Sequence, residues 1–250
     1  MMLDVNGIRF AYKSTNILDG VDFDLGPTEV LSILGPNGVG KTTLLKCING
    51  ILRIRSGTVM VQKEDLSTLS RTEVAKRIGY VPQRGDQPRI TVFDAVLLGR
   101  KPHITWDVGR ADIDMTNQAI KSLGLEDLAM CYIDEISGGE FQKVQIARAL
   151  VQEPNVILLD EPTSSLDLRN QHRMMRRIVD LVKGKGLTAV MSMHDLNLAL
   201  RYSDKFIMLK EGRIFAAGGS EVVTPENIEH VYEISVYVEK VRGHLTVVPC

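Results

Sequence analysis

No stretch of this sequence is apolar for long enough to cross a membrane. Its apolar runs, such as Val156 to Leu159, have the length of buried strands, far short of the ~20 residues that a spanning helix needs. The beginning of the chain contains Asp4 and no apolar segment typical of secretory signals. Cysteine is also scarce, and Cys47, Cys131 and Cys250 lack the spacing of metal ligands. We therefore expect neither a secretory signal nor a membrane-spanning segment. We expect the chain to lie in the reducing interior of the cell, the cytoplasm.

An excess of charge of either sign is lacking as well. The formal net charge is −1, which argues against a broad nucleic-acid-binding face but is compatible with a local basic patch. Of the 250 residues, 44% are apolar and 24% are charged, which is ordinary for a globular protein. This length is enough for one large α/β domain, or for a core that carries an inserted subdomain.

A glycine-rich loop lies between an apolar segment and a helix-forming segment. Val30 to Leu34 has strand character, Gly35 to Gly40 follows, and Lys41 opens the predicted helix. This is a G-x-x-x-x-G-K-[ST] loop in a strand–loop–helix setting, where backbone N–H groups and a helix N-terminus converge on phosphate. Lys41 could reach the β- and γ-phosphates, and the Thr42 hydroxyl could ligate Mg²⁺. The alternative is a glycine turn beside an ordinary lysine; the full motif favours binding of a nucleoside triphosphate.

Two candidate residues stand at the ends of predicted strands. Residues 3–10 read as an edge strand, and Tyr12 follows them; its ring could stack on a base or simply cover a half-buried strand end. The strand predicted at 78–81 ends before Gln83. A glutamine there is unremarkable by itself, but at the sheet edge where the phosphate loop emerges its amide could reach Mg²⁺ or the attacking water.

Strand patterns give way to helical ones between about residues 85 and 154. We expect helices at 92–98, 113–123 and 139–151, with chain breaks before and after the block, and interpret it as an inserted helical subdomain. Near its end, Ser137 and Glu140 form a capping box, which would stabilise the helix alone. Gly138 and Gly139 weaken a first helical turn but leave uncovered N–H donors, which suit a phosphate.

Acidic and histidine residues follow two further apolar strands. Asp160 ends the strand at 156–159 and could hold the Mg²⁺ shell. Glu161 comes next along the strand, so we expect it to point the other way, where it could orient or deprotonate the attacking water. His194 follows the strand predicted at 187–193; such a histidine is more often a packing group, but a γ-phosphate contact is plausible at this edge.

The order of these motifs resembles that of the nucleotide-binding subunit of ABC transporters. In family terms, residues 35–42 look like the Walker A motif, Gln83 like the Q-loop and residues 137–140 like the signature. Residues 160–161 look like the Walker B motif, Asp167 like the D-loop and His194 like the H-loop. Tyr12 falls at the adenine-stacking position, and the resemblance covers about residues 3 to 218. Two conservative departures, Ile136 for leucine and Glu140 for glutamine, are not expected to abolish ATPase activity.

The resemblance implies ATP and Mg²⁺ as cofactors and gives each candidate residue a role. The catalytic group comprises Glu161, His194 and Gln83, and the metal-binding group comprises Thr42, Gln83 and Asp160. The nucleotide-binding group comprises Tyr12, Asn37, Gly38, Gly40, Lys41, Thr42, Thr43, Ser137, Gly139 and Asp167.

The resemblance also implies the fold. We expect an α/β protein with a P-loop, RecA-like nucleotide-binding core, an N-terminal antiparallel β-subdomain and an inserted α-helical subdomain. All belong to one ABC ATPase domain over residues 1–250, in which 1–86 and 155–250 form the core and β-subdomain, and 87–154 forms the helical signature subdomain.

The implied assembly is a head-to-tail dimer, either homotypic or heterotypic, that sandwiches two ATP molecules. Ser137 and Gly139 of one subunit would contact the γ-phosphate held by Lys41 of the other, and a two-fold axis satisfies both copies at once. Opening and closing of the dimer would be transmitted to membrane permease subunits. An extracytoplasmic substrate-binding protein would take part indirectly, and no nucleic acid is expected as a partner. The expected location is the cytoplasmic face of the membrane.

A finer resemblance concerns the transported substrate. Residues 91–102 and 193–204 look most like importer ATPases for iron-siderophores, haem and cobalamin, although molybdate importers share much of this pattern. The alternatives are a soluble ABC-type ATPase with a non-transport partner and a nucleotide-dependent scaffold. The single cassette, without heptads or a C-x-x-C pair, disfavours the first, and the presence of Glu161 and His194 disfavours the second.

Overall fold

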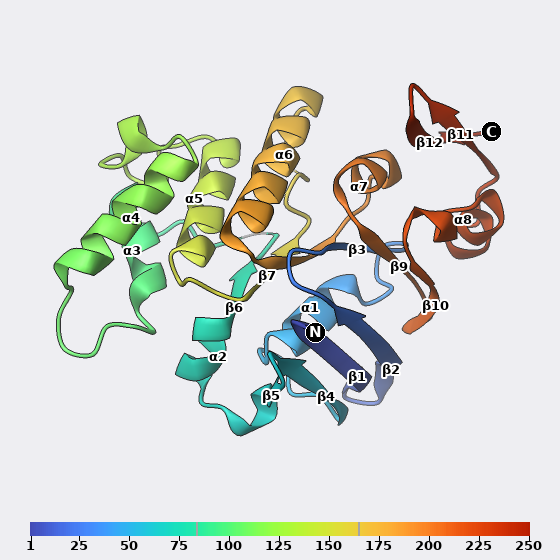
Figure 1. Ribbon diagram of the computed structural model, residues 1–250, viewed down its shortest axis with the longest axis horizontal. Helices are drawn as coiled ribbons and strands as arrows, with labels where there is room; N and C mark the ends of the chain where they lie inside the picture. The colour runs from blue at the N-terminus through green and yellow to red at the C-terminus, as the bar shows by residue number, and fades with distance from the viewer. Residues whose placement is uncertain (84, 165) are drawn as a thin grey trace.

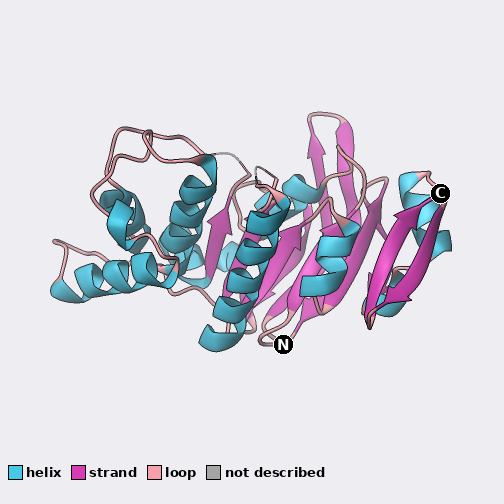
Figure 2. Ribbon diagram, turned by 90° about the horizontal axis from the view of Figure 1, so that it is seen from above, coloured by secondary structure: helices cyan, strands magenta, loops and turns pink. Residues whose placement is uncertain are grey.

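The computed structural model describes residues 1–83, 85–164 and 166–250. Two sheets lie one above the other, an all-helical region flanks them at one end, and a two-stranded ribbon lies at the other end (Figures 1 and 2). In these described ranges, no helix combines the length and the apolar content that a bilayer crossing requires.

The smaller sheet is antiparallel, with the strand order β2-β1-β4-β5. It comprises β1 (Leu3–Tyr12), β2 (Thr15–Leu25), β4 (Ser56–Val61) and β5 (Glu64–Asp65). The prediction of an edge strand at 3–10 is wrong, because β1 pairs with β2 on one side and with β4 on the other. Alternation shows that one face of a strand is buried, but it does not reveal how many neighbours pair with its backbone.

The larger sheet has the order β10-β9-β3-β8-β7-β6. Its parallel strands are β3 (Val30–Leu34), β6 (Ile78–Val81), β7 (Val156–Asp160), β8 (Thr188–Ser192) and β9 (Lys205–Lys210), and β10 (Arg213–Gly218) pairs antiparallel to β9. Parallel strands have their carboxyl ends at the same edge of the sheet. The residues that follow β3, β6, β7 and β8 therefore lie at one edge.

Both faces of the parallel sheet are covered, as expected for strands that are apolar throughout. Along β7, Val156 and Leu158 belong to a core shared with the antiparallel sheet and with α1 (Lys41–Ile48), which lies between the two sheets (Figure 1). Ile157 and Leu159 point into the opposite core.

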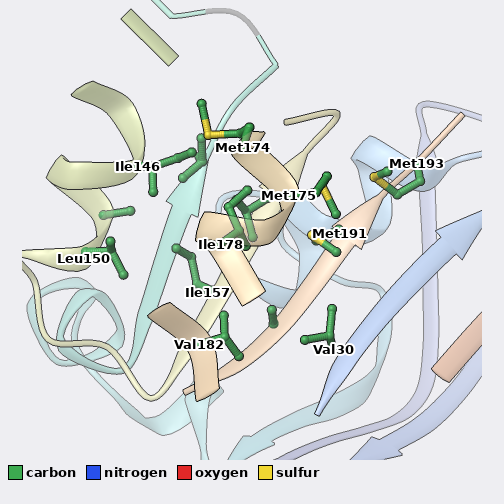
Figure 3. Close-up of a cluster of buried hydrophobic side chains, with 14 of the residues drawn as sticks. Val30, Ile146, Leu150, Ile157, Met174, Met175, Ile178, Val182, Met191 and Met193 are labelled. Atoms are coloured by element: carbon green, nitrogen blue, oxygen red, sulfur yellow. The ribbon is translucent and has the colours of Figure 1, made fainter. Parts of the chain in front are cut away.

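Helices α5 (Gly138–Leu150), α6 (Leu168–Lys185) and α7 (Leu196–Tyr202) line this second core (Figure 2). Figure 3 shows Met174 and Met175 of α6 packed near Met191 of β8, with Ile146 of α5 at the side. Methionine fills irregular gaps well because its side chain is unbranched and flexible.

The predicted helical block contains α3 (Val92–Leu97), α4 (Arg110–Ser122) and α5. Their apolar residues join the core on the α6 side of the parallel sheet, so the block and the sheet share one continuous cluster. Because of this shared core, the packing alone does not divide the chain at 87 and 154, and these domain boundaries remain a prediction.

Two short helices, α2 (Arg71–Arg77) and α8 (Pro225–Tyr232), begin where the sequence signals a helix start. Both have strong local start signals: a Ser70–Glu73 capping box precedes α2, and Thr224 caps α8 with Pro225 at its first turn. The chain ends in a hairpin of β11 (Val236–Val241) and β12 (His244–Pro249).

Candidate functional site

The phosphate loop connects β3 to α1 and needs glycine at two positions for different reasons. Gly35 has a φ of 143°, and a Cβ there would lie 2.6 Å from the Leu209 carbonyl oxygen. Gly40 has a φ of 112° and caps the first turn of α1, where a Cβ would press against Ile17 and Leu18 of β2. The antiparallel sheet therefore packs directly on the loop and helps to shape it.

Lys41 begins α1 and turns its ammonium group back into the loop. Its Nζ donates to the Gly35 carbonyl at 2.7 Å and to the Pro36 carbonyl at 3.0 Å, and the residue is only 5% exposed. Burial lowers the pKa of Lys41, an effect that the nearby carboxylates of Glu161 and Asp160 oppose. A buried cation thus lies against the loop, which is the arrangement that a polyphosphate requires.

Asp160 ends β7 with a buried carboxylate directed at α1. The Thr42 hydroxyl donates to Asp160 Oδ1 at 2.9 Å, and the Ser192 hydroxyl donates to the same oxygen at 2.7 Å. The Tyr80 hydroxyl lies 3.5 Å from Asp160 Oδ2, and burial together with this carboxylate raises the pKa of Tyr80 well above its usual value. Hard oxygen atoms of Thr42 and Asp160 therefore face each other, as in a Mg²⁺ site.

Sequence reasoning did not identify Ser192 or Tyr80. Ser192 is the polar last residue of β8, and Tyr80 is the only residue of β6 with a side-chain hydroxyl group. Both signals were present, but a polar residue near a strand end has many uses. Only the pairing of β7 with β8 and β6 shows that these hydroxyl groups point at Asp160.

Glu161 points away from Asp160, but not because of strand alternation. β7 ends at Asp160, and Glu161 adopts a φ of 48°, in the left-handed region that non-glycine residues seldom occupy. The chain turns there, and the Glu161 N–H donates to Ser192 Oγ at 2.9 Å. Such strained residues persist where surrounding structure enforces them, and they are frequent at functional sites.

The Glu161 carboxylate lies between the side chains of Gln83 and His194. The Gln83 amide donates to Glu161 Oε2, and His194 Nε2 donates to Glu161 Oε1 when that nitrogen carries the proton. Gln83 follows β6 and His194 follows β8, on either side of β7 in the sheet. The structure therefore brings together Lys41, Thr42, Gln83, Asp160, Glu161 and His194 at one sheet edge, and their roles stay a prediction.

Ser137 is a helix cap, as the capping-box alternative predicted. Its Oγ accepts the Glu140 N–H at 3.4 Å and donates to Glu140 Oε2 at 2.6 Å, while the Ser137 N–H donates to the same carboxylate oxygen at 2.9 Å. The Ser137 hydroxyl bond is the main reason that the pKa of Glu140 is lowered. Ser137 and Gly138 are exposed, so the cap does not block access to the start of α5.

The remaining predicted residues also lie on the surface. Tyr12 is 48% exposed at the end of β1, and its ring packs edge-on against Phe10 with 4.8 Å between centroids. Asp167 caps α6 and accepts the Asn170 N–H at 2.8 Å. Gly139 lies close to Leu166, so that a Cβ on Gly139 would come within 3.0 Å of it. In the part of the chain that the structure describes, no hydrogen bond joins any of these three residues to Lys41 or Glu161.

A cleft of about 1310 Å³ lies between the helical block and the rest of the chain. Ile51 and Leu98 line it and are about half exposed, at 55% and 48%. Gln145 of α5 also lines the cleft, and within the described residues its buried side-chain oxygen has no hydrogen-bond partner. A cleft with half-exposed apolar side chains is suited to binding a protein segment.

Comparison with known proteins agrees with this geometry. A family model described as ABC transporter matches residues 18–164. An uncharacterised ABC transporter ATP-binding protein of Methanocaldococcus jannaschii is 57% identical over 100% of this chain and 98% of its own length. A cobalamin import ATP-binding protein of Halobacterium salinarum is 36% identical over 100% of this chain, which spans 64% of that longer protein.

Two solved structures extend the comparison. An inward-facing metal-chelate type ABC transporter matches 100% of this chain and 97% of its own, with 31% identity and a TM-score of 0.87. A dimeric ATP-binding cassette in a post-hydrolysis state, bound to ADP and phosphate, matches 87% of this chain and 98% of its own, with 28% identity and a TM-score of 0.78.

The chain therefore belongs to the family of ABC transporter ATP-binding proteins, and it has the ABC ATPase fold. It is an ABC-type ATPase and binds nucleotide. The predicted fold, a P-loop core with an antiparallel β-subdomain and added helices, is confirmed.

Proposed function

We propose that this chain is the ATP-hydrolysing subunit of an importer that takes up a metal chelate of the iron-siderophore, haem or cobalamin type. The main support is the strand-edge cluster of Lys41, Thr42, Asp160 and Glu161, which combines a buried cation, oxygen ligands for a metal ion and a carboxylate that could orient water. The substrate class is supported by relatives named for cobalamin and petrobactin import and by the metal-chelate transporter structure.

Mg·ATP would occupy the phosphate loop and the hollow beside it. The loop residues Asn37, Gly38, Gly40 and Thr43 would surround the phosphates, and Tyr12 would stack on adenine. Lys41 would exchange its two backbone carbonyl partners for phosphate oxygens. Thr42 and Asp160, whose oxygens are 2.9 Å apart, would hold Mg²⁺ directly or through water, with Gln83 as a further ligand.

Hydrolysis would depend on the side chains around Glu161. Its two carboxylate oxygens are engaged by Gln83 and His194. A water in line with the γ-phosphate would replace these contacts, and Glu161 would orient it and accept its proton. His194 and Gln83 would then be free to contact the γ-phosphate and Mg²⁺.

A second copy, or a closely related subunit, would complete each nucleotide site. Ser137 is exposed and Gly139 is partly exposed at the start of α5, and Asp167 caps α6. None of them bonds to the phosphate loop of its own chain in the described parts of the structure. Leu168 next to Asp167 is 69% exposed, which suits burial by a partner. A two-fold dimer would bring these groups onto the partner's ATP.

Membrane permease subunits would dock in the cleft between the helical block and the rest of the chain. The half-exposed Ile51 and Leu98 would become buried against the permease. Gln83 lies between Pro82 and Gly85, which both line this cleft. Nucleotide contacts at Gln83 and permease contacts in the cleft would therefore be linked. The protein would then lie at the cytoplasmic face of the membrane, with a substrate-binding protein acting on the far side and no nucleic acid involved.

Reconstitution tests this function. The chain would be purified with a candidate permease, placed in lipid vesicles and supplied with Mg·ATP and either cobalamin or an iron-siderophore. We expect ATP-dependent accumulation of one chelate, and none with the Glu161→Gln variant assembled on the same permease. ATP hydrolysis without co-purification of any multi-spanning protein would instead favour a non-transport ATPase, and accumulation of molybdate alone would reject the chelate assignment.

A further inference from the structure

The C-terminal segment, residues 225–250, carries no sequence motif, yet it contacts the phosphate loop. It contains α8 and the β11–β12 hairpin, and it lies at the end of the molecule beside β9 and β10 (Figure 1). Ile228 and Val231 of α8 are buried in the core on the α6 side of the parallel sheet, together with Met208 of β9. The segment is therefore docked on the ATPase core through apolar contacts.

Tyr232, the last residue of α8, has a direct hydrogen bond to the site. Its hydroxyl oxygen accepts the N–H of Gly35 at 2.7 Å, across 197 positions of sequence. Burial raises the pKa of this hydroxyl to about 12, so it remains neutral at physiological pH.

Tyr232 holds the peptide directly before the two that bind Lys41, because the Gly35 N–H belongs to the Leu34–Gly35 peptide unit. The carbonyl oxygens of Gly35 and Pro36 accept the two hydrogen bonds of the Lys41 ammonium. Because Gly35 has a φ that only glycine adopts readily, its peptide has little intrinsic preference for this orientation. The bond to Tyr232 fixes the Leu34–Gly35 peptide at the start of the loop, so that the carbonyl oxygens around Lys41 extend from an anchored point.

The rest of the segment is anchored near the other side of the site. The Asn197 side chain donates to the Val247 carbonyl at 3.1 Å and accepts the Val247 N–H at 2.7 Å. Asn197 lies in the first turn of α7, which Asp195 caps immediately after His194. The segment thus contacts the loop before Lys41 through α8 and the helix after His194 through β12.

We propose that the C-terminal segment is a positioning element for the nucleotide site, and that Tyr232 is the positioning residue through which it orients the phosphate loop. Tyr232 does not contact the nucleotide. It preorganises Gly35, so that ATP binds a loop that is already shaped. By linkage, nucleotide bound in the loop in turn stabilises the docking of α8.

The test compares Tyr232→Phe with Tyr202→Phe. Each variant loses one phenolic hydroxyl that is hydrogen-bonded in the folded chain, but Tyr202 bonds to His172 on α6 and not to the phosphate loop. Calorimetric titration with ATP, with Mg²⁺ present, would give the affinity. We expect Tyr232→Phe to bind ATP about 3- to 10-fold more weakly, the range for one lost hydrogen bond, and Tyr202→Phe to bind as the unmodified chain does.

Hydrogen exchange separates positioning from general stability. In the Tyr232→Phe variant, the peptide containing Gly35 should exchange faster without nucleotide, while peptides of β7 and β8 should be unchanged. In the unmodified chain, ATP should slow exchange in α8, and this effect should be lost in Tyr232→Phe. If that variant melts at a lower temperature but keeps its ATP affinity and the response of α8 to ATP, the hydroxyl is only a structural contact and the proposal is wrong.

Discussion

Replacing Ser192 with alanine tests how the acidic end of β7 is held in place. The Ser192 hydroxyl donates to Asp160 Oδ1 at 2.7 Å and accepts the Glu161 N–H at 2.9 Å, and the residue is 0% exposed. One small side chain thus ties both acidic residues to β8. Alanine would remove both bonds and leave too little space for water to replace them.

The magnitude follows from these two bonds. A hydrogen bond to a charged group contributes about 1.5–3 kcal/mol, and a buried N–H without a partner costs about 1–3 kcal/mol. The two effects share one side chain and are not additive. We therefore expect the free energy of unfolding to fall by about 3 kcal/mol, which corresponds to a drop in Tm of about 6–12 °C for a domain of this size.

Ser32→Ala is the matched control. Ser32 is also 0% exposed and lies on β3 of the same sheet, but its hydroxyl bonds at 2.6 Å to the neutral hydroxyl of Ser203. Its loss should lower the free energy of unfolding by only about 1 kcal/mol. Thermal unfolding of both variants, without nucleotide, gives the comparison.

Activity supplies a second measurement for the same variants. Because Asp160 and Thr42 are proposed to hold Mg²⁺, Ser192→Ala should need more Mg²⁺ for half-maximal ATP hydrolysis, and Ser32→Ala should not. The two variants could instead lose the same free energy of unfolding and keep the same Mg²⁺ dependence. In that case, Ser192 does not hold Asp160 in position for Mg²⁺, and this reasoning is wrong.

Three further substitutions test the proposed roles. Lys41→Ala should abolish tight ATP binding in a calorimeter, because the phosphates lose their buried cation; unchanged affinity would refute that role. Glu161→Gln should keep ATP bound but slow hydrolysis by ~10²-fold or more, as expected for a lost general base, and a normal rate would mean that another group handles the water. Ser137→Arg should preserve nucleotide binding and prevent ATP-driven dimers on a sizing column, whereas normal dimerisation would contradict the sandwich arrangement.

Local patterns were sufficient for much of the fold and for the identity of the candidate residues. The bounds of α2 and α8 could be predicted because a capping box and an N-terminal proline act within one turn of the helix. Apolar strands followed by Gly35, Gln83, Asp160 and His194 indicated a sheet edge, because parallel strands have their carboxyl ends on the same side. The sequence did not show that β1 is an interior strand, because a strand's pairing partners leave no local signal.

The sequence by itself determined the phosphate-binding motif, the order of the functional residues and hence the family. Only the tertiary structure decided which side chains meet: Ser192 with Asp160, Gln83 and His194 with Glu161, and Tyr232 with Gly35. The physical reason is that glycine conformations, caps and apolar periodicity act over a few residues. Contacts between distant segments depend instead on strand order and on the way a helix packs against the sheet, which the whole core sets together.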